Sequence, residues 1–205
     1  MPDGAMKTKG ERTSERILDV AEALFATNGY EGASLRAICR EAGIQQPGIY
    51  NHFESKQHLY AAVLDRALSP MAAALENRLS HHDPARAQAE LPGVMTDLLL
   101  EHPSMAALFQ QALQGDPSSV GNQMLQTWLD RLFAQGIEAL EPVAVGLDRV
   151  DLALRIIALF NLTTGYFLSQ RAFESMGGGD ITNPDNVARQ KQLLERLARA
   201  VMPSS

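Results

Sequence analysis

Residues 34–56 read SLRAICREAGIQQPGIYNHFESK and predict two short helices joined by a glycine turn. In the first helix, four apolar residues recur at i, i+3, i+4 and i+7, which is the spacing of a single buried face. These residues are Leu35, Ile38, Cys39 and Ala42. Ser34 is a favourable N-cap residue, and Gly43 suits the left-handed backbone that commonly follows a helix. The first helix is therefore expected to end at Gly43.

The second helix is predicted to begin at about Gln46, because the fixed φ of Pro47 and its missing N–H suit a first helical turn. It runs to about Phe53, and Ile49 and Phe53, four residues apart, face inward. Two short helices joined by a tight turn that contains glycine form a helix-turn-helix. The second helix of such a motif lies in the DNA major groove.

The pattern S-L-R-A-I-C-x-x-A-G-I-x-x-x-G-I-Y-x-H-F-x-S-K resembles the DNA-binding motif of TetR-family transcriptional regulators. The family usually has Thr in place of Ser34 and Ala in place of Cys39, and both replacements keep the size and chemistry of the side chain. The resemblance covers residues 12–60 or so. It implies an all-α fold, in which an N-terminal three-helix helix-turn-helix domain is joined by a linking helix to a larger C-terminal helical domain that binds a ligand and dimerises.

Three segments are expected along the chain. They are an N-terminal arm at 1–11, a helix-turn-helix DNA-binding domain at 12–60, and a helical ligand-binding and dimerisation domain at 61–205. The helix that links the two domains is predicted to kink or break near Ser69, because Pro70 removes one backbone hydrogen bond and clashes with the preceding turn.

The first helix is predicted at about 13–28, and Thr8 with Glu11 offers an earlier capping box. The core of the three-helix domain is predicted to consist of Ile17, Ala21, Leu24, Phe25, Leu35, Ile38, Ile49 and Phe53. Cap and proline signals place the later helices at about 84–101, 103–114, 117–140, 148–175 and 184–201. No alternating pattern of useful length predicts a strand.

The chain has 205 residues, a net charge of −6 and an apolar content of 45%, which is ordinary for a globular protein. Its single cysteine, Cys39, excludes a disulfide framework and a cysteine metal site, and fits a reducing cytosol. The N-terminal MPDGAMKTKG lacks the apolar segment of a secretory signal. The longest apolar run, 152–168, contains Arg155 and Asn161 and is short for a membrane helix. A cytoplasmic protein without a membrane span is expected.

Ten residues are expected to contact double-stranded DNA: Ser34, Arg36, Gln45, Gln46, Pro47, Gly48, Tyr50, Asn51, His52 and Lys56. The resemblance implies that bases are read or approached by Gln46, Pro47, Gly48 and Asn51. It implies that phosphates are held by Ser34, Arg36, Tyr50, His52 and Lys56. Gln and Asn pair bidentately with adenine, and Gly lets the backbone come close to DNA. The alternative, a merely solvated helix face, gives no reason for these residue types. The second helix has no Arg or Lys, which argues against strong guanine recognition there.

The Met and aromatic residues of the C-terminal region are each ordinary core residues, but as a set they suit the adaptable apolar cavity found in regulators that resemble this chain. The residues expected to bind a small apolar effector are Met95, Leu99, Met105, Phe109, Met124, Trp128, Phe160, Asn161, Thr164 and Phe167. For Asn161, Thr163 and Thr164 two interpretations are open. They hydrogen-bond to a ligand, or they bond back to their own helix.

The helix predicted at 148–175 is apolar on every side between Val150 and Leu168, so both of its faces are expected to be buried. The helix at 184–201 has an apolar side as well. The resemblance implies that these two helices pack into an intermolecular four-helix bundle of a homodimer. The expected interface consists of Leu152, Ile156, Leu159, Thr163, Leu194, Leu197 and Val201.

Two functions are considered. The first is a ligand-responsive, sequence-specific transcriptional regulator, usually a repressor in the family that the chain resembles, which binds a palindromic operator as a homodimer. The second is a small-molecule binding protein or enzyme built on the C-terminal domain, with the N-terminal unit as an interaction module. The sequence contains no catalytic motif, so no enzyme and no cofactor are expected. His81, His82 and His102 lack the spacing of metal ligands, so no metal site is expected.

Overall fold

The computed structural model describes residues 8–79, 84–141, 144 and 146–201, and all regular structure in these residues is helical. The predicted all-α fold is thereby confirmed. The helices are α1 (Lys9–Gly32), α2 (Leu35–Glu41), α3 (Gln46–Ile49), α4 (Lys56–Leu79), α5 (Pro84–Glu101), α6 (Ser104–Gln114), α7 (Val120–Leu140), α8 (Arg149–Phe167), α9 (Gln170–Ser175) and α10 (Pro184–Val201). Residues 1–7 of the predicted arm, and His81 and His82, lie outside the described residues.

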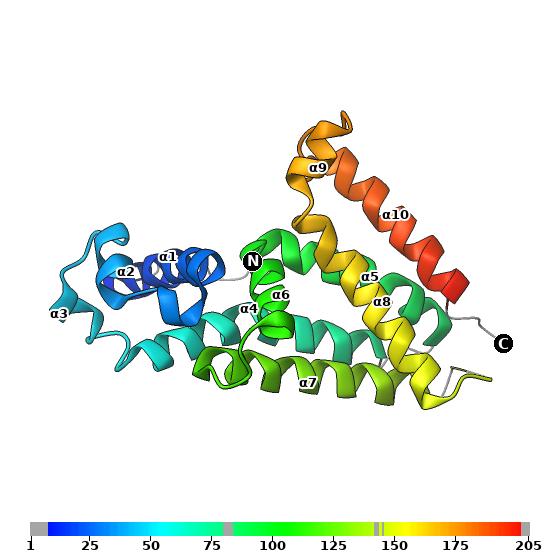
Figure 1. Ribbon diagram of the computed structural model, residues 1–205, viewed down its shortest axis with the longest axis horizontal. Coiled ribbons are helices and arrows are strands. Elements are labelled where there is room, and N and C mark those ends of the chain that lie inside the picture. The colour runs from blue at the N-terminus through cyan, green and yellow to red at the C-terminus, as the bar shows by residue number, and fades with distance from the viewer. Residues whose placement is uncertain (1–7, 80–83, 142–143, 145, 202–205) are drawn as a thin grey trace.

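The helix-turn-helix forms one end of the molecule (Figure 1). Helices α1, α2 and α3 make up this end, and the long helix α4 leads from it along the larger helical part of the chain. Helix α4 packs against α1, α5 and α7, and α6 lies between α1 and the rest of the larger part, in contact with α1, α7 and α8. Helix α3 thus lies at the tip, far from α8 and α10.

Helix α1 begins at Lys9, earlier than the position predicted from its apolar stripe. The reason is the Thr8–Glu11 capping box: Glu11 N donates to Thr8 Oγ1 at 3.2 Å, and Thr8 N donates to the Glu11 carboxylate at 2.7 Å. The regular helix is interrupted at Gly29, whose φ of 71° only glycine adopts without strain. The capping box therefore converts residues 9–11 of the predicted arm into the first turn of α1.

The predicted core of the three-helix unit is largely correct. Six of its eight members are buried, and two, Leu24 and Leu35, are half-buried and pack against the others. The buried members are Ile17, Ala21, Phe25, Ile38, Ile49 and Phe53. The same cluster continues through Leu59, Val63 and Met71 of α4 to Leu125 and Leu129 of α7. One continuous apolar core therefore connects the helix-turn-helix to the larger helical part.

The predicted break near Ser69 is absent from the described residues of α4. Helix α4 continues through Pro70, because proline removes only the single hydrogen bond to the carbonyl of Arg66, while the buried Ala67, Leu68 and Met71 hold the helix in the core. The helix predicted at 148–175 is divided. Helix α8 ends at Phe167, where Ser169 donates from N to Tyr166 O and from Oγ to Gly165 O, and the short helix α9 follows.

Helix α7 begins at Val120, three residues later than predicted. Asp116 Oδ1 accepts hydrogen bonds from Ser118 N and Ser118 Oγ, both at 2.8 Å, and so holds the chain in a turn before the helix. These hydrogen bonds stabilise the ionised carboxylate and lower the pKa of Asp116. The Asp-Pro pair thus marks a turn at this place and not the start of a helix.

Candidate DNA-binding surface and apolar cavity

The turn between α2 and α3 has the geometry that the sequence predicts. Ser34 Oγ accepts a hydrogen bond from Ala37 N at 3.1 Å and caps α2. Gly43 has a φ of 64°, and Ile44 N donates to Cys39 O at 3.0 Å, which closes the end of α2. Helix α3 has only four residues, but the backbone continues to turn, since Phe53 N donates to Ile49 O at 2.9 Å.

The residues predicted to contact DNA lie around this turn. Seven of them are exposed: Ser34, Arg36, Gln45, Gln46, Pro47, Tyr50 and Asn51. Gly48, His52 and Lys56 are half-buried. Figure 1 shows α3 at the far end of the molecule, where no other helix covers it. The structure therefore brings these residues together on one accessible surface.

Gly48 is not needed for the fold. Its φ is not positive, and a Cβ built at this position would meet no atom within 4 Å. Open space at a glycine of a short exposed helix means that the absent side chain leaves room for something outside the chain. The approach of the Gly48 backbone to DNA stays a prediction, and this open space would allow it.

Lys56, the first residue of α4, is engaged within the protein. Its Nζ donates to Glu31 O at 3.2 Å and lies 4.5 Å from the centre of the Tyr30 ring. Tyr30 stacks on Phe25 and also contacts Tyr60 of α4, with ring centres 6.0 Å and 5.0 Å apart. Burial raises the pKa of the Tyr60 hydroxyl, which therefore stays neutral. Lys56 is thus tied to the aromatic group that joins α1 to α4.

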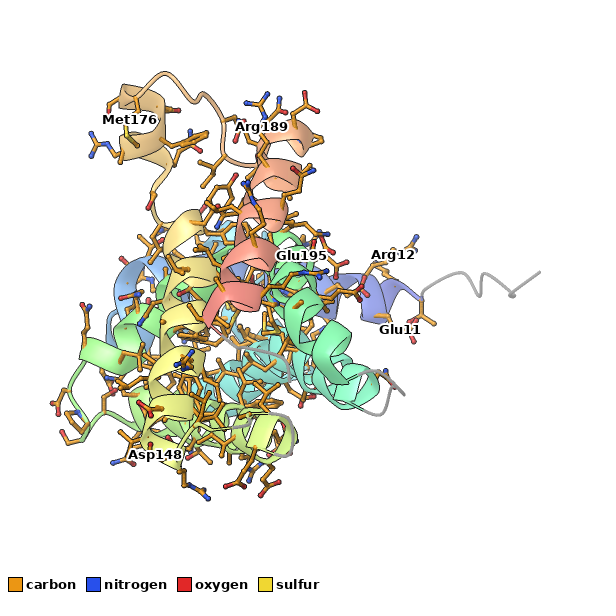
Figure 2. All side chains as sticks on the ribbon, turned by 90° about the vertical axis from the view of Figure 1, so that its right-hand side faces the viewer. Glu11, Arg12, Asp148, Met176, Arg189 and Glu195 are labelled. Carbon is orange, nitrogen blue, oxygen red and sulfur yellow. The ribbon has the colours of Figure 1, made fainter. Side chains whose placement is uncertain are left out.

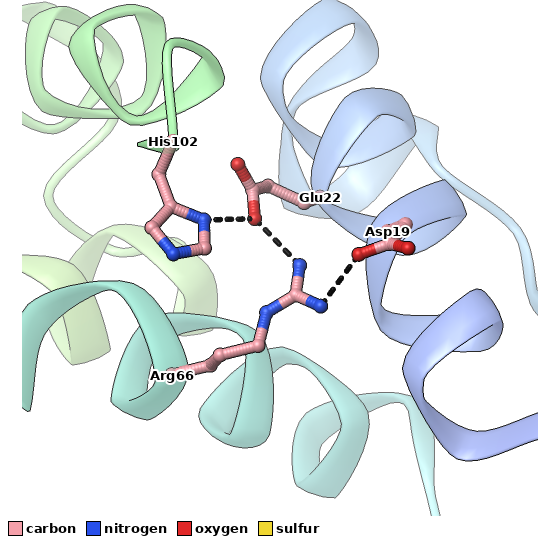
Figure 3. A network of polar contacts seen from close by, with 4 residues as sticks. All are labelled: Asp19, Glu22, Arg66 and His102. Carbon is pink, nitrogen blue, oxygen red and sulfur yellow. Dashed lines mark hydrogen bonds and ion pairs between the residues drawn. The ribbon is translucent and has the colours of Figure 1, made fainter. Parts of the chain in front are cut away.

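A second junction lies near the middle of α1 and is polar (Figure 3). Arg66 of α4 donates from Nη1 to Asp19 at 2.6 Å and from Nη2 to Glu22 Oε2 at 2.7 Å. The same oxygen of Glu22 lies 3.0 Å from Nδ1 of His102, which follows α5. Glu22 is only 5% exposed. Three separate parts of the chain therefore meet at one buried carboxylate.

Tyr30 also fixes the position of α7. It lies so close to Gly121 that a Cβ at Gly121 would overlap the Tyr30 side chain. Gly121 is buried, so no larger residue fits there without moving α1 and α7 apart. Gln111 of α6 donates to Ala26 O of α1 and adds a polar contact at the same junction. Helix α1 is thus held by α4, α6 and α7 together.

An apolar cavity lies between α5, α6, α7 and α8. Its empty volume is about 730 Å³ including the part open to solvent. It is lined by Leu91, Pro92, Met95, Leu99, Phe109, Leu132, Phe133, Gly136, Leu140, Ile156, Leu159, Phe160, Thr163 and Thr164. The rings of Phe109 and Phe133 lie 5.5 Å and 5.1 Å from that of Phe160, and both contacts are tilted or edge-to-face.

The two threonines of the cavity have their hydroxyl groups engaged within α8. Thr163 Oγ1 donates to Leu159 O at 2.8 Å, and Thr164 Oγ1 donates to Phe160 O at 2.9 Å. Of the two interpretations open for these residues, the bond to their own helix is the one observed. None of the described lining residues carries a charge.

The structure places half of the predicted cavity residues at the cavity. Met95, Leu99, Phe109, Phe160 and Thr164 line it. Five others do not, namely Met105, Met124, Trp128, Asn161 and Phe167. Met105 is fully buried in the core, and Asn161 is exposed on the outer side of α8. Sequence reasoning missed Gly136, although a glycine in the interior of a helix is a sign of close packing or of a site.

Most of the residues predicted for the dimer interface lie at the cavity or in the interior of the subunit. Ile156, Leu159 and Thr163 line the cavity, while Leu152 and Leu194 are each 1% exposed and belong to the interior of the subunit. Leu152, Thr163 and Leu194 are thus buried within the single chain, and the part of the predicted interface that they form stays a prediction. Leu197 and Val201 are half-buried.

A different set of apolar side chains is exposed on α8. Val150, Leu154 and Ile157 are 66%, 61% and 46% exposed, and Leu168 continues the row at helical spacing. Leu193 of α10 is exposed as well. Figure 2 shows α8 and α10 side by side on the face turned to the viewer, and they contact each other. The exposed apolar side chains of α8, together with Leu193 of α10, are here called the α8/α10 face.

By length and composition alone, α8 could cross a membrane, since it has 19 residues and a window of mean hydropathy 1.3. The length of α8 therefore does not exclude a membrane helix. However, α8 packs against α5, α6, α7 and α10, and Arg155 is one of its half-buried residues. A helix that is packed on several sides and apolar on the remaining one is typical of a protein–protein interface.

Comparison with known proteins adds to this geometry. The family model of the bacterial regulatory proteins of the tetR family matches residues 17–63. The HTH-type transcriptional regulator UidR of Escherichia coli (strain K12) is 26% identical over 198 residues, which cover 96% of this chain and 83% of UidR.

Two solved structures share the fold. A fatty acid metabolism regulator from Clostridium perfringens has a TM-score of 0.73 and 18% identity, over 91% of this chain and 96% of that one. The regulator FadR from Bacillus subtilis, in complex with stearoyl-CoA, has a TM-score of 0.64 and 18% identity, over 90% of this chain and 97% of that one. At this identity the likeness concerns the fold alone.

Proposed function

Since the chain is a TetR-family transcriptional regulator, we propose that it binds a specific palindromic operator as a homodimer and that a small apolar effector changes this binding. The protein is proposed to act in the cytoplasm as a repressor, because a dimer seated on promoter DNA excludes other proteins from it. Residues 12–60 carry the DNA-binding role, and residues 61–205 carry the effector-binding and dimerisation roles.

The observation that carries the proposal is the surface around α3. Gln46 and Asn51 are exposed there, and both have side chains that can pair bidentately with adenine. The open space at Gly48 lets the backbone between them approach a base pair. Arg36 and Tyr50 are exposed nearby and can contact phosphates, which fix the position of the helix in the groove.

Dimerisation is proposed to bury the α8/α10 face. A contiguous exposed apolar surface on a globular protein commonly marks an interaction site. Two copies that pair through this face form an isologous contact, in which the same surface is used twice. Because the face is far from α3, pairing leaves both reading helices free and fixes their separation (Figure 1). A fixed separation suits two half-sites of a palindrome.

The effector is proposed to bind in the apolar cavity. In support, the cavity is lined almost entirely by apolar side chains, among them Met95, Phe109 and Phe160, which suit an apolar ligand. The FadR structure from Bacillus subtilis contains stearoyl-CoA, so a chain of this fold can hold a ligand with an apolar part.

A path for coupling leads from the cavity to α1. Leu99 and Met95 of α5 line the cavity, and His102 follows at the end of the same helix, where it contacts Glu22 of α1. We propose that a shift of α5 on effector binding is felt at Glu22 and changes the placement of the helix-turn-helix. The coupling free energy in such systems is typically about 1–3 kcal/mol.

The DNA-binding part is tested by incubating the purified protein with fragments of the genome that encodes it and sequencing those retained. A small set of fragments that share an inverted repeat is expected. Retention of random fragments in proportion to their abundance would refute sequence-specific binding. A control protein with Asn51→Ala and Gln46→Ala should retain DNA without enriching the repeat.

A further inference from the structure

The lining of the cavity limits the chemistry of its ligand. From it we infer that the effector is an uncharged molecule, mainly hydrocarbon, with an aromatic ring in contact with Phe160. This inference rests on the proposed function, because it concerns the ligand of the same cavity. It goes further by naming the class of ligand.

In the part of the chain that the structure describes, the cavity offers no charged group to pair with an ionic ligand. The described residues that line the cavity are apolar except for Thr163 and Thr164. A carboxylate or phosphate that entered would lose its hydration without meeting a cation, which costs several kcal/mol. A cationic ligand would likewise find no carboxylate among these residues. The cavity therefore selects against both kinds of ion.

The two hydroxyl groups of the cavity are already used as hydrogen-bond donors. Thr163 and Thr164 already donate their hydroxyl protons to Leu159 O and Phe160 O in α8. A ligand with a strong acceptor, such as a ketone or an amide, could gain a donor only by breaking one of these bonds. A ligand without strong polar groups loses nothing on entry, so the hydrocarbon is preferred.

The cavity contains a cluster of aromatic rings. Phe160 contacts Phe109 and Phe133, with ring centres 5.5 Å and 5.1 Å away. A further ring beside them can add another edge-to-face or offset contact, which is worth about 0.5–1.5 kcal/mol beyond the burial of its area. An aromatic ligand should therefore bind about 2–10-fold more tightly than its saturated counterpart of similar size.

Isothermal titration calorimetry with three probes of one size class tests the inference on the full-length protein at neutral pH. The probes are ethylbenzene, ethylcyclohexane and 4-ethylbenzoate. Ethylbenzene should bind most tightly, ethylcyclohexane about 2–10-fold more weakly, and the anion at least about 100-fold more weakly. Phe160→Leu should weaken ethylbenzene more than ethylcyclohexane, because only the former loses a ring contact.

Gly136→Leu serves to assign binding to the cavity. A Cβ at Gly136 would lie 3.8 Å from Ile156 Cδ1, an ordinary contact, and a longer side chain must extend into the cavity. Gly136→Leu should abolish probe binding, whereas Gly136→Ala should retain most of it. If Gly136→Leu shows no cooperative thermal unfolding, it is not folded. In that case Leu132→Phe, which enlarges another lining residue, is used in its place.

The outcomes separate the inference from the proposed function. Equal or tighter binding of 4-ethylbenzoate that Gly136→Leu abolishes would overturn the ligand class and leave the cavity as the effector site. Equal binding of ethylbenzene and ethylcyclohexane would overturn the aromatic preference. If no probe binds, or if the cavity-filling variants bind the probes as the wild type does, the ligand class and the effector part of the proposed function both fail. Operator binding is measured separately and does not depend on this result.

Discussion

His102 Nδ1 lies 3.0 Å from the Oε2 atom of Glu22, although the two residues are 80 positions apart in the sequence. The same oxygen accepts a hydrogen bond from Arg66 at 2.7 Å. Glu22 belongs to α1, Arg66 to α4 and His102 to the connection between α5 and α6. The contact joins the helix-turn-helix to the end of a helix that lines the cavity. It is therefore a structural tie, and it is the contact through which the coupling proposed above would act.

The first prediction concerns this tie. Glu22→Gln should lower the free energy of unfolding by about 3–5 kcal/mol, because it removes the buried negative charge that pairs with Arg66. Among the described residues, Arg66 Nε is already buried without a hydrogen-bond partner, so a weaker partner at Glu22 would leave the guanidinium still less satisfied. The change is measured by chemical denaturation.

Asp19→Asn is the matched control for Glu22→Gln. Asp19 pairs with the same arginine, but its side chain is 70% exposed, so its loss should cost only about 0.2–1 kcal/mol. Equal costs for the two variants would show that Glu22 has no special role. A double-mutant cycle of Glu22→Gln with His102→Ala should give a coupling energy of about 0.5–3 kcal/mol.

The second prediction concerns Gly48. Gly48→Ala should leave the free protein as stable as before or stabilise it by up to about 1 kcal/mol, because the added methyl meets no atom and alanine favours the helix. The same methyl should weaken DNA binding by about 1–3 kcal/mol, as overpacking does elsewhere. Denaturation and DNA titration measure the two effects. Unchanged DNA affinity would mean that the backbone at Gly48 does not approach DNA.

The third prediction concerns the α8/α10 face. The wild-type protein should sediment as a dimer at micromolar concentration, and Leu154→Glu together with Ile157→Glu should sediment as a monomer with unchanged helix content. Both side chains are exposed in the subunit, so charge is tolerated there unless a partner covers it. Leu113→Glu is the control, because Leu113 is 44% exposed on α6, away from this face. A dimer that survives the double substitution would place the interface elsewhere.

The fourth prediction concerns the thiol of Cys39. Burial raises its pKa, and the side chain is 3% exposed, so it should react with a thiol reagent much more slowly than the unfolded chain does. A raised pKa favours the neutral thiol in the folded state. Its contribution to stability is therefore complete below the pKa of the unfolded thiol and is lost as pH rises through the raised value. Rapid labelling at neutral pH would contradict this.

The helix-turn-helix was predictable because its signals are local. Ser34, Gly43 and Pro47 mark caps and a turn within a few residues of each other, and the structure has a cap, a left-handed glycine and a helix start at these positions. Thr8 and Glu11 were equally informative, and the capping box they form sets the true start of α1. The apolar stripe alone placed this start too late, since the first turn of α1 is polar.

The outer and inner sides of α8 were not predictable from the sequence. In a helix that is apolar on every side, the sequence pattern does not show which side faces inward. Ile156 in the cavity and Ile157 on the surface therefore look alike in the sequence. The contacts of α8 with α5, α6 and α7 decide which side faces inward. In the same way, nothing local indicates that His102 meets Glu22, because their contact depends on how α5 and α6 pack against α1.

The fifth prediction tests the central claim, which is that α3 reads a DNA sequence. Fluorescence anisotropy at one salt concentration gives the affinities for the retained repeat and for a scrambled duplex of equal composition. The wild type should prefer the repeat by about 10³-fold or more. Gln46→Ala and Asn51→Ala should each reduce this preference by about 1–3 kcal/mol, while Arg36→Ala, which removes an exposed side chain proposed to contact phosphate, should weaken both duplexes alike. Equal affinities of the wild type for the repeat and the scrambled duplex would contradict the account.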